Sequence, residues 1–253
     1  MDRMKGGMIS WILILLLLLV TMASGIVLLH IYKDNYKTYN LLKVDPLETS
    51  GLKAENLEAT LRKSDIWMLG DSRVRRWNEE LLKDTIEIAN LGVEGQTSSQ
   101  VYYRFKTYLE TATPSLVILE VGINELKIIG LDKNLTTSIT DQYFRNIESI
   151  IQICREKNIK MVLINIFPVG KIELTRRLVW NKAVNEAIID SNQKLQSYCD
   201  DIRVYCFDAC SILSANGETV KTDYQSDFLH INNRGYEALS RELKEQINKI
   251  MKQ

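Results

Sequence analysis

Two short segments far apart in the chain hold side chains suited to nucleophilic catalysis. Ser72 follows Gly70-Asp71 at the end of an apolar run, where a serine can point its hydroxyl into a crevice. The N-terminus of a following helix would favour negative charge developing there. His230 comes three residues after Asp227, and it is the only histidine beyond the apolar N-terminal segment. This spacing lets the carboxylate hold one ring nitrogen and leaves the other nitrogen for a serine.

Two further segments could supply hydrogen-bond donors to an oxyanion. Asn124 follows another apolar run, and its side-chain amide could either donate to an oxyanion or cap the next turn. The loop from Asn90 to Thr97 contains two glycines, which could be ordinary turn residues or leave a backbone N–H open to a substrate. We interpret Gly92 as a turn residue. Each segment taken alone also fits a plain turn, and Ser72 alone fits a helix cap.

Three arginines crowd the helix that follows Ser72. Arg73, Arg75 and Arg76 place positive charge in its first turns, where a cation opposes the helix dipole. A substrate or a carboxylate partner could compensate this charge, and the nearby Glu79 and Glu80 are the favoured explanation. The Gly-x-Ser-x-Gly elbow of the α/β-hydrolases is absent from the chain, which excludes that family.

From residue 64 onward, five apolar runs alternate with amphipathic stretches. The predicted strands are 66–69, 86–90, 116–121, 160–167 and 202–207, and the predicted helices are 98–111, 142–157, 178–198 and 234–251. Continuous apolar strands alternating with helices predict a parallel sheet covered on both faces, a three-layer α/β/α sandwich. Ligands of such sheets bind at the carboxyl ends of the strands, where three of the polar segments occur. The fourth, Asp227 to His230, precedes the predicted helix 234–251.

The composition is that of an ordinary globular protein. Of 253 residues, 25% are charged and 45% are hydrophobic, which excludes a disordered chain, a collagen-like repeat and a small disulfide scaffold. The 32 basic and 32 acidic residues cancel, so we expect no nucleic-acid partner. One histidine beyond the apolar segment rules out a His-rich metal site, and neither a metal nor a cofactor is expected.

The N-terminal segment predicts a membrane anchor. Residues 9–29 are almost continuously apolar, and at 1.5 Å per residue they span roughly the ~30 Å hydrocarbon core. We expect a tail at 1–8, a single transmembrane signal anchor at 9–31, a stalk at 32–63 with a helical stretch at 52–62, and one domain at 64–253. A cleaved signal peptide is the alternative, but its apolar region is usually only ~7–15 residues long.

The orientation of this anchor is not decided by the flanking basic residues, which occur on both sides. The short N-terminal tail can stay in the cytoplasm, which favours a domain on the extracytoplasmic side of the cell membrane.

Four cysteines, Cys154, Cys199, Cys206 and Cys210, match no zinc motif. Cys206 and Cys210 could pair in an oxidising compartment, but isolated buried thiols are the default expectation.

Together the four segments resemble the ordered sequence blocks of the SGNH (GDSL-type) hydrolase family. The matching blocks are Gly70-Asp71-Ser72, Asn90 to Gly95, Gly122-x-Asn124-Glu125 and Asp227-x-x-His230. The resemblance covers about residues 64–251 and implies a flavodoxin-like SGNH hydrolase fold. It also implies that Ser72, Asp227 and His230 are catalytic and that the oxyanion hole consists of Ser72, Gly95 and Asn124. Gly95 matches the family's donor glycine because it lies five residues after Asn90.

Two residues depart from the family pattern. Glu125 stands where an aspartate is usual, and this acid is not one of the family's catalytic groups. Arg73 stands where a leucine is common, and it is expected to alter the acyl or leaving-group pocket.

The resemblance implies a membrane-anchored serine esterase that uses an acyl-enzyme and needs no metal. The expected substrates are small acyl esters, such as acetates, on small molecules or on a surface glycan or lipid. Two alternatives stay open. One is an O-acyltransferase that passes the acyl group to a sugar hydroxyl, and the other is a non-catalytic, tethered glycan-binding module.

Overall fold

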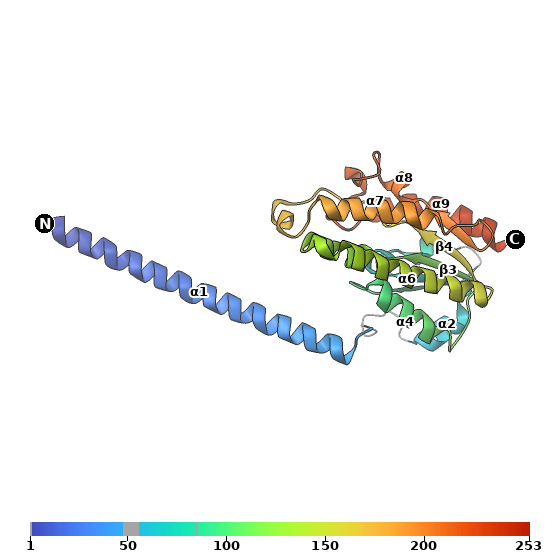
Figure 1. The fold of residues 1–253 in the computed structure, drawn as a ribbon, viewed down its shortest axis with the longest axis horizontal. Helices are drawn as coiled ribbons and strands as arrows, with labels where there is room; N and C mark the ends of the chain where they lie inside the picture. Colours follow the sequence, from blue (N-terminus) through green and yellow to red (C-terminus); the bar gives the residue numbers. More distant parts are fainter. Residues whose placement is uncertain (1, 48–55, 84–85) are drawn as a thin grey trace. The chain divides into compact units, whose positions relative to one another are not determined.

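A computed structural model describes residues 2–47, 56–83 and 86–253 of the chain. The chain divides into two units, residues 1–46 and residues 47–253, and each is described by itself. The first unit is one helix, α1 (Asp2–Val44). Figure 1 shows the second unit as a sheet enclosed by helices.

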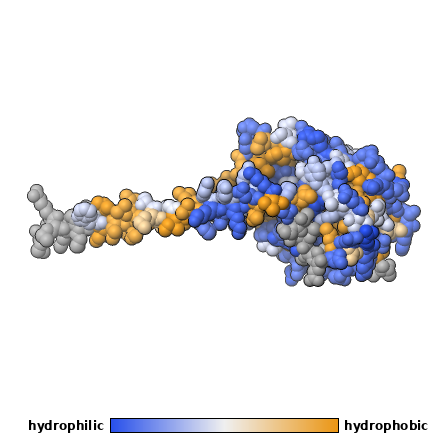
Figure 2. All heavy atoms as spheres, turned by 90° about the horizontal axis from the view of Figure 1, so that it is seen from below, coloured by the Kyte–Doolittle hydropathy of each residue, from blue (hydrophilic) through white to orange (hydrophobic). Residues whose placement is uncertain are grey.

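Helix α1 contains the predicted anchor. Its part Trp11–Val44 includes an 18-residue window with a mean hydropathy of 3.0, so by length and composition it could cross a membrane. A signal sequence near the N-terminus has the same properties. Figure 2 shows hydrophobic side chains along much of this helix. The helix continues to Val44, so the first part of the predicted stalk is helical. Residues 52–55 of the predicted stretch 52–62 lie outside the described residues, and the described helix α2 spans Leu57–Lys63.

The sheet has five parallel strands in the order β2-β1-β3-β4-β5. They are β1 (Ile66–Gly70), β2 (Ile88–Gly92), β3 (Leu116–Glu120), β4 (Lys160–Ile164) and β5 (Val204–Phe207). In the register, Gly70 lies between Gly92 and Glu120, so the loops after β1, β2 and β3 begin at the same level. The strand order reverses at β1, and such a switch point is where open α/β sheets bind ligands.

Helices cover both faces of the sheet, which confirms the predicted three-layer sandwich (Figure 1). Successive strand residues point to opposite faces, so each strand contributes to two separate cores. On one face Trp67 and Leu119 pack with α4 (Ser98–Tyr108), α6 (Thr136–Glu156) and α7 (Lys182–Gln196). On the other face Met68 and Ile118 pack with α3 (Ser72–Arg75), α8 (Ala209–Leu213) and α9 (Asn233–Met251). The further helical elements of the described chain are short: α5 (Ile123–Leu126) and the 3-10 helices η2 (Glu79–Leu81), η3 (Lys127–Gly130), η4 (Lys133–Leu135), η5 (Leu174–Leu178) and η6 (Thr222–Tyr224).

Several predicted boundaries shift by a few residues for identifiable reasons. The last predicted strand begins at Val204 rather than Ile202 because Asp200 Oδ1 accepts the N–H groups of residues 202, 203 and 204 at 3.0, 2.7 and 2.9 Å.

Gly92 is the last residue of β2, so its interpretation as a turn residue was wrong. A Cβ at Gly92 would lie 2.3 Å from the backbone nitrogen of Arg75, which explains the glycine by close packing.

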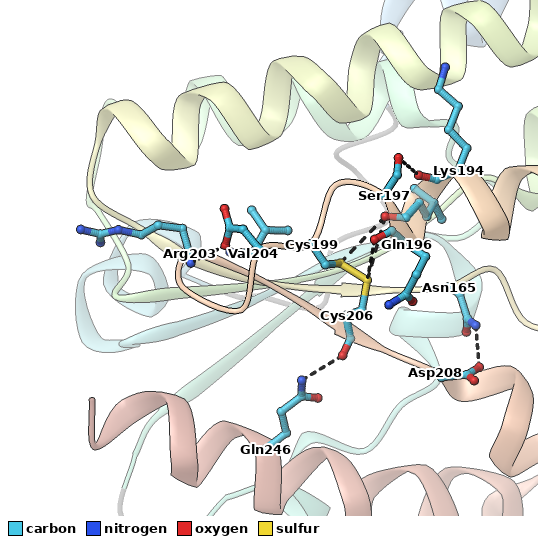
Figure 3. Close-up of a disulfide and its surroundings, with 12 residues drawn as sticks. Asn165, Lys194, Gln196, Ser197, Cys199, Arg203, Val204, Cys206, Asp208 and Gln246 are labelled. Atoms are coloured by element: carbon cyan, nitrogen blue, oxygen red, sulfur yellow. Dashed lines mark hydrogen bonds between the residues drawn. A yellow bond between two sulfur atoms is a disulfide. The ribbon is translucent and has the colours of Figure 1, made fainter.

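One cysteine prediction is corrected. Cys199, just after α7, forms a disulfide with Cys206 on β5, and their Cα atoms are 5.7 Å apart (Figure 3). The pairing follows from the fold, which places the chain after α7 alongside β5. Cys210 is a free thiol, and its sulfur instead contacts the carbonyl of Ile166 at 3.3 Å. Cys154 is also free and buried, as expected.

Candidate active site

The structure brings Ser72, His230 and Asp227 into one hydrogen-bonded row. Ser72 Oγ lies 3.0 Å from His230 Nε2, and His230 Nδ1 lies 2.8 Å from Asp227 Oδ2. A carboxylate only accepts hydrogen bonds, so Nδ1 carries the proton and Nε2 is left as an acceptor for the serine hydroxyl. This is the arrangement in which a histidine can remove a serine proton.

A tight turn holds Asp227 against the histidine. Asp227 Oδ1 accepts the backbone N–H groups of Leu229 and His230 at 2.8 and 2.9 Å. Partial burial raises the pKa of Asp227, but the hydrogen bonds from the His230 ring and these two N–H groups outweigh it and lower the pKa below its ordinary value. The carboxylate is therefore favoured in its ionised form, which stabilises a positive charge on the imidazole.

Two backbone N–H groups near Ser72 are available to a ligand. Ser72 begins α3, so its N–H has no intrahelical acceptor, and none is found in the described part of the chain. Gly95 has a φ of +76° and is exposed, and its N–H also lacks an acceptor among the described residues. A Cβ at Gly95 would meet nothing within 4 Å, so the glycine is explained by its backbone conformation.

The Asn124 amide joins the loops after β1 and β2. Its Nδ2 donates to Gln96 O at 2.9 Å and, more weakly, to Asp71 Oδ2 at 3.2 Å. Its Oδ1 accepts from Lys127 Nζ at 2.8 Å, which fixes the amide with its nitrogen toward the loops.

Two buried residues support the loop after β2 and the helix that follows it, and the sequence predicted this role for neither of them. Arg104 of α4 is completely buried, and it donates to Gln96 Oε1 and to Leu91 O, both at 2.8 Å. Glu125 accepts the N–H of Ser98 at 2.7 Å, at the first turn of α4. Glu125 therefore caps a helix, which fits the expectation that it is not a catalytic group.

Arg73, which stands where a leucine is common in the family, points into the interior of the domain. Its side chain is completely buried, with Nη1 3.4 Å from Glu120 Oε1 and Nε donating to Leu229 O at 3.1 Å. The main chain of Arg73 is fixed as well, because Tyr236 of α9 donates its hydroxyl to the Arg73 carbonyl at 2.8 Å. Arg73 thus connects the serine loop to the loop that carries His230.

The buried cluster around Arg73 contains two carboxyl groups and one guanidinium. Burial raises the pKa of Asp71 and raises the pKa of Glu120 to about 8, and the two carboxyls repel each other. One guanidinium balances one carboxylate, so the second carboxyl is favoured in its protonated form.

The Glu120 carboxyl predicts a pH dependence of stability. Because the folded state holds the Glu120 proton more tightly than the unfolded chain, its contribution to the free energy of unfolding falls as pH rises from the ordinary 4.5 through about 8. Glu120→Gln cannot release a proton, so its Tm should fall less than that of the wild type between about pH 5 and about pH 8. Thermal unfolding monitored by circular dichroism measures this, with the exposed Glu237→Gln as the control. Equal Tm changes in the wild type and Glu120→Gln would contradict the assignment.

Arg76 is compensated by a different acid from those predicted. Its guanidinium binds Glu94 through Nε and Nη2 at 3.1 and 3.3 Å, and it lies 3.9 Å from Asp227 Oδ2. The hydrogen bond with Glu94 raises the pKa of Arg76. The interpretation that Glu79 and Glu80 compensate these arginines was therefore wrong, because the described side chain of Glu80 pairs with Lys83 instead.

A cavity of about 470 Å³ borders His230. Apolar walls come from Ile128, Leu131, Val179, Trp180, Phe228 and Leu229, and charged side chains come from Lys127, Glu173, Arg176 and Asp227. Within the described ranges, no group of three or more His, Cys, Asp or Glu side chains is placed to hold a metal ion.

Comparisons with known proteins place this chain among ester hydrolases. The sequence profile of the GDSL-like lipase/acylhydrolase family matches residues 60–238. The platelet-activating factor acetylhydrolase IB subunit alpha2 of Bos taurus is 24% identical over 212 residues, which cover 78% of this chain and 82% of that protein.

Two solved structures share the fold. A GDSL-like lipase from Bacteroides thetaiotaomicron has a TM-score of 0.60 at 22% identity, covering 85% of this chain and 98% of that one. A carbohydrate acetylesterase family member from Sinorhizobium meliloti has a TM-score of 0.58 at 14% identity, covering 75% and 100%.

Proposed function

Because the chain belongs to the GDSL-like lipase/acylhydrolase family of SGNH hydrolases and is a carboxylic ester hydrolase, we propose that Ser72 is its nucleophile. His230 is the general base, and Asp227 orients and stabilises its imidazole. The observation that carries this assignment is the continuous hydrogen-bonded row from Asp227 through His230 to Ser72.

The proposed reaction has two halves. His230 Nε2 takes the Ser72 proton while Oγ attacks the ester carbonyl, and the imidazolium then donates that proton to the leaving alcohol. In the second half, His230 activates a water that attacks the acyl-enzyme, and the acid is released as Ser72 regains its proton. The charge on Asp227 stabilises the imidazolium in both halves.

We assign the oxyanion hole to the N–H groups of Ser72 and Gly95 and to the amide of Asn124. The two backbone donors have no acceptor in the described part of the chain, and the Asn124 amide has one weak bond that an oxyanion can replace. Such donors stabilise the tetrahedral intermediate because they are already oriented when its charge develops.

The proposed substrates are small acyl esters, such as acetates, of a surface glycan or lipid. The test is hydrolysis of a panel of acetyl, butyryl and longer esters by the full chain in neutral-detergent micelles. Short acyl groups should react best, and no turnover of any ester would contradict the proposal. Product analysis with and without an added acceptor sugar identifies a transferase, which would yield an acylated sugar in place of free acid.

We further propose that α1 anchors the chain in the cell membrane with the hydrolase domain outside. The disulfide between Cys199 and Cys206 supports this orientation, because disulfides persist in oxidising compartments outside the cytoplasm. The length of the apolar segment supports retention of the anchor over cleavage.

The proposed topology predicts the result of protease treatment. Protease added to intact spheroplasts should degrade the hydrolase domain and leave an N-terminal fragment in the membrane. A protected domain would reverse the orientation, and a mature chain that lacks the first ~25 residues would show cleavage of a signal peptide.

A further inference from the structure

Two cations face the cavity beside His230 without a carboxylate partner. Lys127 and Arg176 both line it, and in the described residues neither forms an ion pair. Glu173 lines the same cavity but pairs with neither of them. Asp227, the other carboxylate at the cavity, is occupied by His230. The cavity lining carries two cations and two carboxylates, but the two cations form no ion pair among the described residues, so they are suited to an anionic ligand.

The Arg176 guanidinium is held by an aromatic ring. It lies 4.8 Å from the centre of the Phe228 ring, and Trp180 packs edge-on against the same ring at 5.5 Å. A cation held over a ring face keeps its N–H groups free for a ligand. Phe228 is two residues from His230, so this stack lies directly beside the proposed general base.

Lys127 approaches the cavity from the oxyanion side. Its ammonium donates to Asn124 Oδ1 at 2.8 Å, and an amide oxygen does not neutralise its charge. Burial and repulsion from Arg176 lower the pKa of Lys127 against the attraction of Asp71 and Glu125. Both cations line the same cavity, so one bound group can lie between them.

We propose that the alcohol part of the substrate carries a carboxylate or phosphate that binds between Lys127 and Arg176. An apolar portion of the same alcohol packs against Trp180 and Phe228. The anion is assigned to the alcohol because the acyl group of the proposed reaction is small, and the leaving oxygen must lie near His230 to be protonated. This inference rests on the proposed function, whose acyl-enzyme chemistry it extends to a substrate class.

The test compares 4-acetoxybenzoate with the neutral 4-acetoxybenzamide, which have the same acetyl group and similar shape. The full chain in neutral-detergent micelles should favour the anionic ester in kcat/KM by about tenfold, the effect of one charge-assisted hydrogen bond. Added sodium chloride should reduce this preference, since the site is partly exposed. Competitive inhibition by benzoate and by phenyl phosphate, with benzamide as the neutral reference, shows whether a carboxylate or a phosphate fits better.

Arg176→Met removes the charge and keeps an apolar side chain over Phe228. In this variant the ratio of kcat/KM for the anionic ester to kcat/KM for the neutral ester should fall toward 1, mainly because KM for the anionic ester rises. Arg177→Met is the matched control, because Arg177 is the next residue of η5 and does not line the cavity, and it should retain the preference. Lys127→Met should lower the preference and also kcat, since Lys127 fixes the Asn124 amide.

The possible failures are distinguishable. Equal kcat/KM for the two esters in the wild type, or an equal effect of Arg176→Met and Arg177→Met, overturns the anionic substrate while leaving the esterase intact. No hydrolysis of either ester, together with no covalent labelling of Ser72, overturns the proposed function itself. If Arg176→Met does not fold, inhibition of the wild type is the test. Stronger inhibition by benzoate than by benzamide supports the anionic substrate, and equal inhibition overturns it.

Discussion

Ser72→Ala is expected to lower kcat for ester hydrolysis by about 10⁴–10⁶, because it removes the atom that forms the acyl-enzyme. His230→Ala should lose a similar amount, since Ser72 Oγ lies 3.0 Å from His230 Nε2 and is hydrogen-bonded to no other base among the described residues. The double variant should lose little more than either single variant. Residues that act as one unit are strongly non-additive, because the second change removes a group that has already lost its role.

Covalent labelling and steady-state kinetics measure this prediction. A fluorophosphonate probe followed by peptide mapping should label Ser72 in the wild type and no residue in Ser72→Ala. Ser191→Ala is the matched control, since Ser191 is also buried and belongs to α7, and it should keep full activity. His30→Ala in α1 is the corresponding control for the histidine. Labelling of another serine, or full activity in Ser72→Ala, would refute the assignment.

Asn124→Ala is expected to lower kcat by about 10²–10³, the usual cost of losing one oxyanion donor. KM should change much less, because the amide acts on charge that develops only in the transition state. The fluorophosphonate probe should still label Ser72, at a lower rate. The nucleophile and its base are unchanged in this variant, so the effect separates oxyanion stabilisation from activation of the serine.

Asn146→Ala provides a matched control for this substitution. Asn146 and Asn124 are each 6% exposed, and Asn146 Nδ2 also makes two hydrogen bonds, to Ser98 and Ser99 at 2.9 and 2.8 Å. Asn146 belongs to α6. Asn146→Ala should lower stability without a comparable loss of kcat. Similar kcat losses in the two variants would show that Asn124 acts only through packing.

The strands and the site loops could be predicted because their signals are local. Apolar runs ending in Gly70-Asp71-Ser72 or near Asn124 mark strand ends, and parallel strands bring those ends to one edge of the sheet. The Asp-x-x-His spacing predicts a turn that closes on itself, and the hydrogen bonds within Asp227–His230 have that geometry.

The supporting interactions could not be predicted, because their partners come from distant segments. Arg73 looks like a surface charge at a helix start, and its burial depends on Glu120 at the end of β3 and on Leu229. Arg104 likewise has its partners on the neighbouring loop rather than on α4 alone. The Cys199–Cys206 pair required knowing that the chain after α7 runs beside β5.

The proposed catalytic pair joins opposite ends of the hydrolase domain, and this has a consequence for biosynthesis. Ser72 follows the first strand, whereas His230 immediately precedes α9, which fixes the serine loop through the bond from Tyr236 to the Arg73 carbonyl. A ribosome must therefore synthesise the chain from Ser72 through His230 before this base reaches the serine. If the chain is exported as proposed, a nascent chain that is passing through a translocon carries the proposed nucleophile without its base and should not hydrolyse esters of the producing cell.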